Sequence, residues 1–238
     1  MRCGREEAVP KLKVCGITDA AFAVEAARRG VDYLGLIFAE GSPRRVTVEK
    51  AGEIIFAVRS AAMEDVSPPG HRVSNAPRFV GVFVDHSVDE IISIASRLKL
   101  DVIQLHGNYG AEKIAVIKAE GYEVWRLYAP TGESQHVETA IEEACDVLSV
   151  ADAVLLDGRK GTQCGGTGVR ADWSLVEPFK RAGRRVVLAG GISAGNIADA
   201  VATGADIIDA NSTLETAPGV KTVGRLDTLL ASFLHGTR

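Results

Sequence analysis

Polar side chains that can transfer protons or bind anions stand at the ends of short apolar runs along this sequence. Thiol, carboxyl, imidazole and guanidinium groups are the ones that enzymes use for acid–base work and for holding anions. The candidates are Cys15, Glu40, Arg44, Asp85, Gln104, His106, Arg126, Tyr128, Asp157 and Asp209. Each also has a structural explanation, because a buried cysteine packs as a small apolar group and an aspartate often caps a loop or helix. Position alone leaves both interpretations open.

Glycine-rich stretches late in the chain indicate a phosphate site. Gly165-Gly166-Thr167-Gly168 and Gly190-Gly191 each follow an apolar run, and so does the polar stretch 211–213. Glycine lets backbone N–H groups approach phosphate oxygens closely, and a helix N-terminus nearby favours the anion. The alternative for Gly190-Gly191 is an ordinary tight turn. We expect a small phosphorylated molecule as the ligand. The residues expected to bind its phosphate are Gly190, Gly191, Asn211, Ser212 and Thr213.

The apolar runs before these residues predict eight strands that alternate with helices. Most runs are short and continuous, which is typical of strands covered on both faces in a parallel sheet. The segments between them carry apolar residues at helical spacing, as in 20–27 and 88–95. The expected strands are 11–15, 33–38, 79–84, 102–105, 123–128, 153–157, 185–189 and 206–209.

Helix ends are marked by residues that suit them. Side-chain oxygens that can accept hydrogen bonds from first-turn N–H groups are offered by Thr18-Asp19, Ser87 with Glu90, Asp172 and Ser193. Glycines that suit the left-handed position after a helix are Gly30, Gly121, Gly183 and Gly204.

Eight strand–helix units in 238 residues predict an α/β fold, a single (β/α)8 barrel that forms one domain over 1–238. The alternative is an open doubly wound sheet. The first strand–helix turn, Cys15-Gly16-Ile17-Thr18, lacks the GxGxxG pattern that such sheets use for nucleotides, which disfavours it. In a barrel the polar residues above would meet at the C-terminal ends of the strands, where barrel enzymes have their active sites.

Two segments are additional to the eight strand–helix units. Residues 1–10 form a short N-terminal extension, and residues 60–78 contain three prolines that make them too irregular for a helix. We expect this insertion on the barrel face opposite the active site, because helix-to-strand connections lie there.

Composition excludes several classes of partner. The net charge of −4 comes without a dense basic run, so we expect no nucleic acid partner. No apolar stretch reaches the ~20 residues that span a bilayer, and the N-terminus lacks a signal-peptide core, so we expect a cytoplasmic protein with no membrane partner. The four cysteines, Cys3, Cys15, Cys145 and Cys164, form no CxxC pair, which predicts free thiols and no zinc site.

Seven motifs in order carry a family resemblance. They are Lys13-Val14-Cys15-Gly16-Ile17-Thr18, Ser42-Pro43-Arg44, Val80-Gly81-Val82-Phe83-Val84, Gln104-Leu105-His106-Gly107, Leu155-Leu156-Asp157, Gly165-Gly166-Thr167-Gly168 and Leu188-Ala189-Gly190-Gly191-Ile192. Together they resemble phosphoribosylanthranilate isomerase, a family of the tryptophan pathway, over 11–230. Any single motif is weak, but seven in register are specific. The resemblance implies a single-domain (β/α)8 barrel without cofactor or metal.

The resemblance also implies a reaction and roles. The reaction is the Amadori rearrangement of N-(5-phosphoribosyl)anthranilate to 1-(2-carboxyphenylamino)-1-deoxyribulose 5-phosphate. Cys15 would be the general base and Asp157 the general acid. Arg44 would face the anthranilate carboxylate, His106 the aromatic end, and Asp209 the ribose hydroxyls. We expect burial to raise the pKa of Asp157, and N–H dipoles and Arg44 to favour the Cys15 thiolate.

One loop departs from the family pattern. Where the family has a VDVSSGVE-like run, this chain has 208–215, with Asn211 in place of a serine and Thr213 in place of a glycine. A β-branched residue resists positive φ, so we expect weakened or rearranged phosphate contacts.

Two alternatives to this function remain open. One is a phosphosugar isomerase of the histidine-pathway type or one that accepts both substrates, although those relatives carry a carboxylate where Cys15 stands. The other is a non-catalytic barrel that binds a phosphosugar. In each case the ligand is a small phosphorylated molecule, and we expect a monomer or homodimer.

Overall fold

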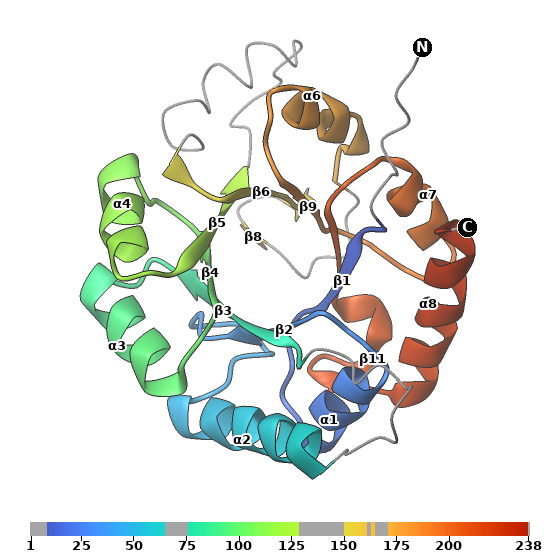
Figure 1. The fold of residues 1–238 in the computed structure, drawn as a ribbon, viewed down its shortest axis with the longest axis horizontal. Helices are drawn as coiled ribbons and strands as arrows, with labels where there is room; N and C mark the ends of the chain where they lie inside the picture. The colour runs from blue at the N-terminus through green and yellow to red at the C-terminus, as the bar shows by residue number, and fades with distance from the viewer. Residues whose placement is uncertain (1–8, 65–75, 129–149, 161–162, 165–170, 238) are drawn as a thin grey trace.

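Eight parallel strands close into a barrel with helices around it (Figure 1). The structure is a computed structural model that describes residues 9–64, 76–128, 150–160, 163–164 and 171–237. Around the barrel the strand order is β1-β10-β9-β6-β5-β4-β3-β2. Since β1 pairs in parallel with both β2 and β10, the sheet has no open edge. The predicted (β/α)8 barrel is therefore confirmed, and the open sheet is wrong.

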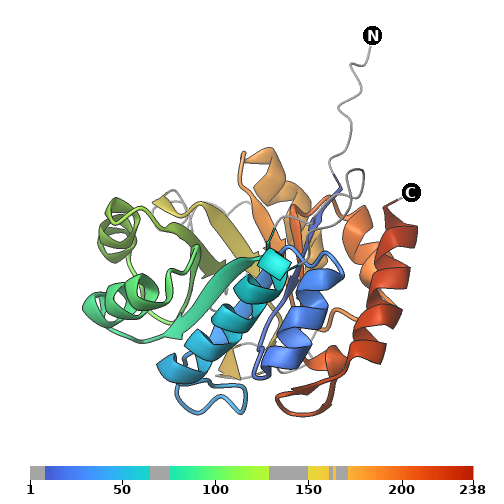
Figure 2. The same ribbon diagram turned by 60° about the horizontal axis from the view of Figure 1, so that its bottom comes forward.

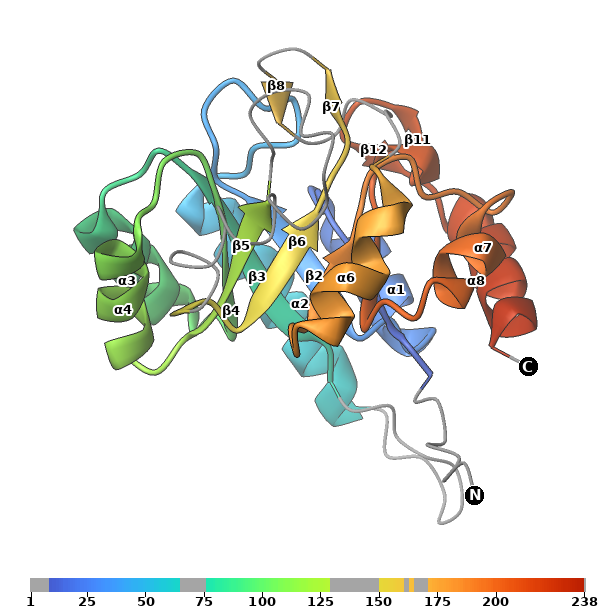
Figure 3. The same ribbon diagram turned by 90° about the horizontal axis from the view of Figure 1, so that it is seen from above.

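The strands begin and end within one residue of the predicted positions. The barrel strands are β1 (Lys11–Val14), β2 (Tyr33–Ile37), β3 (Arg78–Val84), β4 (Val102–His106), β5 (Glu123–Tyr128), β6 (Ala153–Leu156), β9 (Val186–Leu188) and β10 (Ile207–Ala210). Two short antiparallel hairpins were not predicted. They are β7 (Arg159–Lys160) with β8 (Gln163–Cys164), and β11 (Glu215–Ala217) with β12 (Val220–Lys221). Both lie at the end toward which the barrel strands point (Figure 3).

The helices cover the outside of the barrel. They are α1 (Ala20–Arg28), α2 (Val48–Glu64), α3 (Val88–Leu98), α4 (Ala111–Ala119), α6 (Val176–Arg181), α7 (Ile197–Ala202) and α8 (Val223–Gly236). Figure 2 shows α2, α1 and α8 side by side along one flank. Alternate strand residues such as Leu12 and Val14 point outward and pack with the buried helix residues in one apolar core.

Most predicted helix ends are confirmed. Asp19 accepts a hydrogen bond from the backbone N–H of Phe22, and Ser87 and Glu90 cap each other's backbone at the start of α3. Asp172 begins the 3₁₀ turn η1 (Trp173–Leu175). The four predicted glycines all have positive φ. The prediction for Ser193 is wrong, because α7 begins only at Ile197 and its N-cap residue is Asn196. The Asn196 side-chain oxygen accepts a hydrogen bond from the backbone N–H of Ser193, which closes the turn before the helix.

The helix before the insertion is longer than predicted. α2 continues to Glu64, so the expectation of irregular structure from residue 60 onward is wrong for 60–64. The reason is that the run Ala61-Ala62-Met63-Glu64 consists of good helix formers, and the first proline comes only at Pro68. Of the rest of the insertion, 65–75 lies outside the described residues and Arg78 already begins β3. Most of the extension and the segment 165–168 also lie outside the described residues.

The lower barrel is filled by apolar side chains. A cluster of inward-facing residues packs there, with Tyr33 against Trp125 at a ring-centroid distance of 5.1 Å. Beneath it Glu123 accepts hydrogen bonds from Arg78 and Arg185, each at 2.5 Å. The barrel is therefore a packed core at this end, and an internal cavity can lie only toward the C-terminal ends of the strands.

Candidate active site

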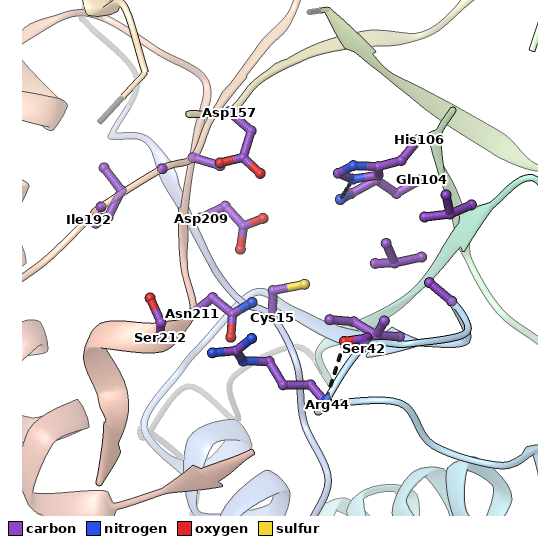
Figure 4. Close-up of a pocket in the computed structure, with 17 residues that line it drawn as sticks. Cys15, Ser42, Arg44, Gln104, His106, Asp157, Ile192, Asp209, Asn211 and Ser212 are labelled. Atoms are coloured by element: carbon purple, nitrogen blue, oxygen red, sulfur yellow. Dashed lines mark hydrogen bonds between the residues drawn. The ribbon is translucent and has the colours of Figure 1, made fainter. Parts of the chain in front are cut away.

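A pocket lies at the C-terminal ends of the barrel strands (Figure 4). The predicted site residues that line it are Cys15, Arg44, His106, Asp157, Gly190, Gly191, Asp209, Asn211 and Ser212. Strand alternation explains this gathering, since each barrel strand aims every second side chain inward and the last inward residue of each reaches the same mouth. The structure thus brings together residues that are up to 197 positions apart in the sequence.

Gln104 also lines the pocket, whereas the other four candidates lie elsewhere. Glu40 and Asp85 line a second hollow outside the barrel mouth. Arg126 donates hydrogen bonds to the carbonyl oxygens of Leu105 and Gly107 and so ties β5 to β4. The Tyr128 ring packs against Phe179. Arg126 and Tyr128 thus help to hold the barrel wall together, and Glu40 and Asp85 do not line the pocket that contains Cys15.

Cys15 and Asp157 point into the pocket from different sides of the barrel. Cys15 follows β1, Asp157 follows β6, and the Asp209 carboxylate lies between them in the view of Figure 4. Gly35 on β2 makes room for the thiol, because a Cβ atom at this glycine would lie 2.7 Å from the Cys15 Sγ. Both side chains therefore line the same pocket.

The pKa of Asp157 is raised to about 7. Burial is the main cause and the charge of Asp209 adds to it, whereas the Gly158 backbone N–H and Lys13 act in the opposite direction. This agrees with the predicted direction. A carboxyl group with this pKa is substantially protonated near neutral pH, so it can act as a proton donor.

The Cys15 thiol behaves differently from the prediction. Burial raises its pKa above the ordinary value, and the largest opposing influence is the charge of Lys13. Arg44 is not among the main influences on this pKa, and its guanidinium is paired with Glu215. No role was predicted for Lys13, although a lysine two residues before Cys15 in extended chain points to the same side as Cys15.

Lys13 and Asp209 form a buried ion pair beside the thiol. The Lys13 Nζ atom lies 2.5 Å from the Asp209 Oδ2 atom, and the two residues are register neighbours on β1 and β10. The Asp209 Oδ1 atom is buried without a hydrogen-bond partner among the described residues. One carboxylate oxygen of Asp209 thus remains as an acceptor at the pocket wall.

Arg44 is held by a network that the sequence analysis missed. Its Nε and Nη2 atoms donate to the two Glu215 carboxylate oxygens, each at 2.8 Å. Glu215 also accepts from Lys221, which donates in turn to the side-chain oxygen of Asn211 at 2.9 Å. Because one edge of the guanidinium is occupied, only its Nη1 side can meet a further anion.

The far end of the pocket is largely apolar. Ile37, Ala39 and Val82 cluster with Cys15 there. Near them the Gln104 side-chain nitrogen lies 2.8 Å from the His106 Nε2 atom, so the two side chains are hydrogen-bonded. This end of the pocket can receive a flat apolar group.

The expected phosphate loops have mixed outcomes. Gly190 and Gly191 have φ values of 83° and 67°, so both positions favour glycine. Thr213 does not line the pocket. It belongs to the 3₁₀ turn η2 (Ser212–Leu214), and its hydroxyl donates to the Ile192 carbonyl oxygen, which ties the two loops together. Among the described non-glycine residues only Asp85 and Lys99 have positive φ, so the expected conflict at Thr213 is wrong.

The described residues offer neither a metal-binding cluster nor a membrane-spanning helix. Across the described part of the chain, histidine, cysteine and carboxylate side chains form no group of three that could hold a metal ion. None of the helices that the structure describes combines the length and apolar character needed to cross a bilayer.

Known proteins resemble the chain over nearly its whole length. Residues 12–231 match the family described as N-(5'phosphoribosyl)anthranilate (PRA) isomerase. The N-(5'-phosphoribosyl)anthranilate isomerase of Campylobacter jejuni is 34% identical over 220 residues, which cover 92% of this chain and 96% of the relative. The enzyme of that name from Zymomonas mobilis is 34% identical over 232 residues, or 96% and 98% of the two chains.

Solved structures agree with these sequence matches. The phosphoribosyl anthranilate isomerase from Thermus thermophilus superimposes with a TM-score of 0.75 at 31% identity, covering 96% of this chain and 100% of the other. A second isomerase was solved with reduced 1-(o-carboxyphenylamino)-1-deoxyribulose 5-phosphate. It has a TM-score of 0.73 and 26% identity, and the match covers 95% of this chain and 99% of that one.

Proposed function

The chain belongs to the phosphoribosylanthranilate isomerase family of tryptophan biosynthesis, and we propose that Cys15 and Asp157 are the base and acid of its reaction. The reaction is the Amadori rearrangement of N-(5-phosphoribosyl)anthranilate to 1-(2-carboxyphenylamino)-1-deoxyribulose 5-phosphate. The observation that carries the residue assignment is that a thiol and a carboxyl group with a pKa of about 7 face one pocket. Such a pair supplies the two proton transfers that this rearrangement needs.

Asp157 acts first in the proposed sequence. Its protonated carboxyl gives a proton to the furanose ring oxygen as the bond from that oxygen to C1′ breaks. The nitrogen lone pair forms the C=N bond of a Schiff base, and Asp157 is left as a carboxylate. Burial favours the protonated starting form of Asp157, since it penalises the charged form.

Cys15 acts second. Its thiolate takes the proton from C2′, and the electrons of that C–H bond form the C1′=C2′ bond of an enolamine while the C=N electrons return to nitrogen. The enolamine then moves its hydroxyl proton to C1′ and becomes the ketone product. The enzyme is left with a thiol and a carboxylate, and one proton passing between them through water restores the starting state.

The pocket walls suit the rest of the substrate. The Nη1 side of Arg44 would pair with the anthranilate carboxylate, and the apolar end below His106 would receive the aromatic ring. The free Oδ1 atom of Asp209 would accept from a ribose hydroxyl. Backbone N–H groups around Gly190, Gly191, Asn211 and Ser212 would hold the phosphate, while Thr213 supports that loop from outside the pocket.

Arg44→Lys should raise KM for the substrate by about 10- to 100-fold and change kcat much less. A lysine cannot bind Glu215 in bidentate fashion and also face a carboxylate, and a hydrogen bond to a charged group is worth about 1.5–3 kcal/mol. Steady-state kinetics would measure the effect. Arg45→Lys is the matched control, because Arg45 is half exposed and lies 3.7 Å from Glu40. An unchanged KM in the Arg44 variant would remove Arg44 from the binding site.

Turnover by the purified protein tests the function directly. Substrate fluorescence should fall with time while the ketone product, separated by chromatography, rises in equal amount. Binding without turnover would favour a non-catalytic barrel. Turnover of the corresponding aminoimidazole ribotide alone would favour the histidine-pathway reaction.

Two further proposals concern the protein in the cell. We propose a cytoplasmic enzyme that works as a monomer or homodimer on a small phosphorylated substrate. Sedimentation of the purified chain at several concentrations would decide between the two assembly states.

A further inference from the structure

Lys13 is a fully buried lysine that the proposed reaction does not use. Its side chain has no solvent exposure, and its ammonium is paired with Asp209 across the contact between β1 and β10. Lysine is almost never fully buried unless it is paired, because removing the charge from water is costly. An apolar pair of similar volume would fill the same space without that cost. The position of this charge therefore calls for an explanation.

The neighbour that explains it is Cys15. Residues 13 and 15 project inward from the same strand, one above the other. Burial alone would lower the pKa of Lys13, yet the charges of Asp209 and Cys15, together with the hydrogen bond to Asp209, raise it overall. An ammonium group has three protons to donate, so it can hold the carboxylate and the sulfur at the same time.

Other charged groups near the thiol have smaller or opposite effects. Asp209 disfavours the thiolate, and Lys221 favours it less than Lys13 does. Arg44 is bound to Glu215, Asp157 faces the thiol from the end of β6, and His106 lies across the pocket beside Gln104. Lys13 is thus the strongest stabilising charge on the Cys15 thiolate among the described residues.

We propose that Lys13 is a positioning residue whose ammonium stabilises the thiolate form of Cys15 against the effect of burial, with Asp209 as the counter-ion that keeps the ammonium in place. The inference rests on the proposed function, since it gives a reason why a buried thiol can serve as a base. The inference goes beyond that function because it names Lys13 as the source of the positive charge that favours ionisation of the Cys15 thiol.

Titration of the thiol tests the proposal without any turnover. Replacing Cys3, Cys145 and Cys164 by serine leaves Cys15 as the sole thiol, and thiolate absorbance at 240 nm against pH then gives its pKa. In this background Lys13→Met should raise the thiol pKa by about 1 unit or more. Lys11→Met is the matched control, since Lys11 lies on the same strand but is exposed, and it should leave the titration unchanged.

A second comparison keeps the test decisive if Lys13→Met alone does not fold. The double variant with Lys13→Met and Asp209→Asn leaves no unpaired buried charge from this pair. Its thiol pKa should exceed that of Asp209→Asn alone, because the two proteins differ only in Lys13. Equal pKa values in this comparison would overturn the proposal and leave Lys13 as a structural counter-ion for Asp209.

Kinetics separate this inference from the assignment of the base. Lys13→Met should lower kcat/KM at neutral pH by about tenfold or more, in line with its smaller thiolate fraction, and higher pH should recover part of the loss. A shifted thiol pKa with unchanged kcat/KM would overturn the catalytic role of Lys13. If Cys15→Ala itself is fully active, the assignment of the base fails, whatever the titration shows.

Discussion

Asp157→Asn should lower kcat by about 10²- to 10⁴-fold, the range that removal of a general acid usually costs. Asparagine keeps the size of the side chain but has no proton to give to the ring oxygen. Substrate binding should change little, because Arg44 and the phosphate loops are untouched. Steady-state kinetics with the fluorescence assay would measure both constants. Asp152→Asn is a suitable control, since Asp152 directly precedes β6 and its carboxylate pairs with Lys118 outside the pocket. A variant with near-normal kcat would rule out Asp157 as the acid.

The pH dependence of kcat/KM gives the same assignment a second readout. Burial raises the pKa of Asp157 to about 7 and that of Cys15 above its ordinary value. The acid must be protonated and the base must be ionised for the reaction to proceed. We therefore expect kcat/KM to rise with pH through the lower of the two pKa values and to fall through the higher one, which gives a bell-shaped pH profile. In Asp157→Asn only the thiolate requirement remains. The alkaline fall should therefore disappear, and an unchanged profile would contradict the assignment.

Cys15→Ala should reduce kcat by a similar factor of about 10² to 10⁴, since the thiolate is the base of the proposed reaction. Cys15→Ser is the sharper variant. The hydroxyl keeps nearly the same volume above Gly35, but its far higher pKa prevents it from becoming a base at neutral pH. Loss of activity in the serine variant with an unchanged melting temperature would isolate the chemistry from packing.

An apolar control accompanies this test. Val82→Ala removes two methyl groups from the same end of the pocket and leaves the thiol in place. It should alter KM more than kcat, because it thins the wall that the aromatic ring would contact. If Cys15→Ser retained full kcat, Cys15 would be only a small packing residue, which is the structural explanation that its burial also permits.

The fold was predictable because its signals are local and repeated. Continuous apolar runs of three to seven residues are typical of strands that are covered on both faces. Eight such strands that alternate with helices form a closed barrel most simply. The start of α7 was mispredicted because Ser193 is a good capping residue that here lies three residues before the cap. The end of α2 was mispredicted because the prolines at 68 and 69 outweighed the helix formers before them.

The site was predictable in part for a related reason. Cys15, Asp157 and Asp209 each end an apolar run, and the barrel rule alone gathers them. Glu215 does not end an apolar run, so its position in the sequence does not predict a site residue. It contacts Arg44 from the β11–β12 hairpin, 171 positions further along the chain. Lys13 was missed because a lysine next to the start of a strand usually faces solvent. Only the pairing of β1 with β10 shows that it is enclosed.

Because β1 pairs with β10, the site around Cys15 can be complete only after the last barrel strand has been added. Lys13 and Asp209 are 196 positions apart, on the two strands that seal the barrel. While a nascent chain emerges, Lys13 is present almost from the outset, but its counter-ion arrives only with β10. Until β10 docks, the ammonium must stay hydrated, and enclosing it alone would cost several kcal/mol. A chain that stops short of β10 therefore lacks both a sealed barrel and a charged group ready to serve the thiol.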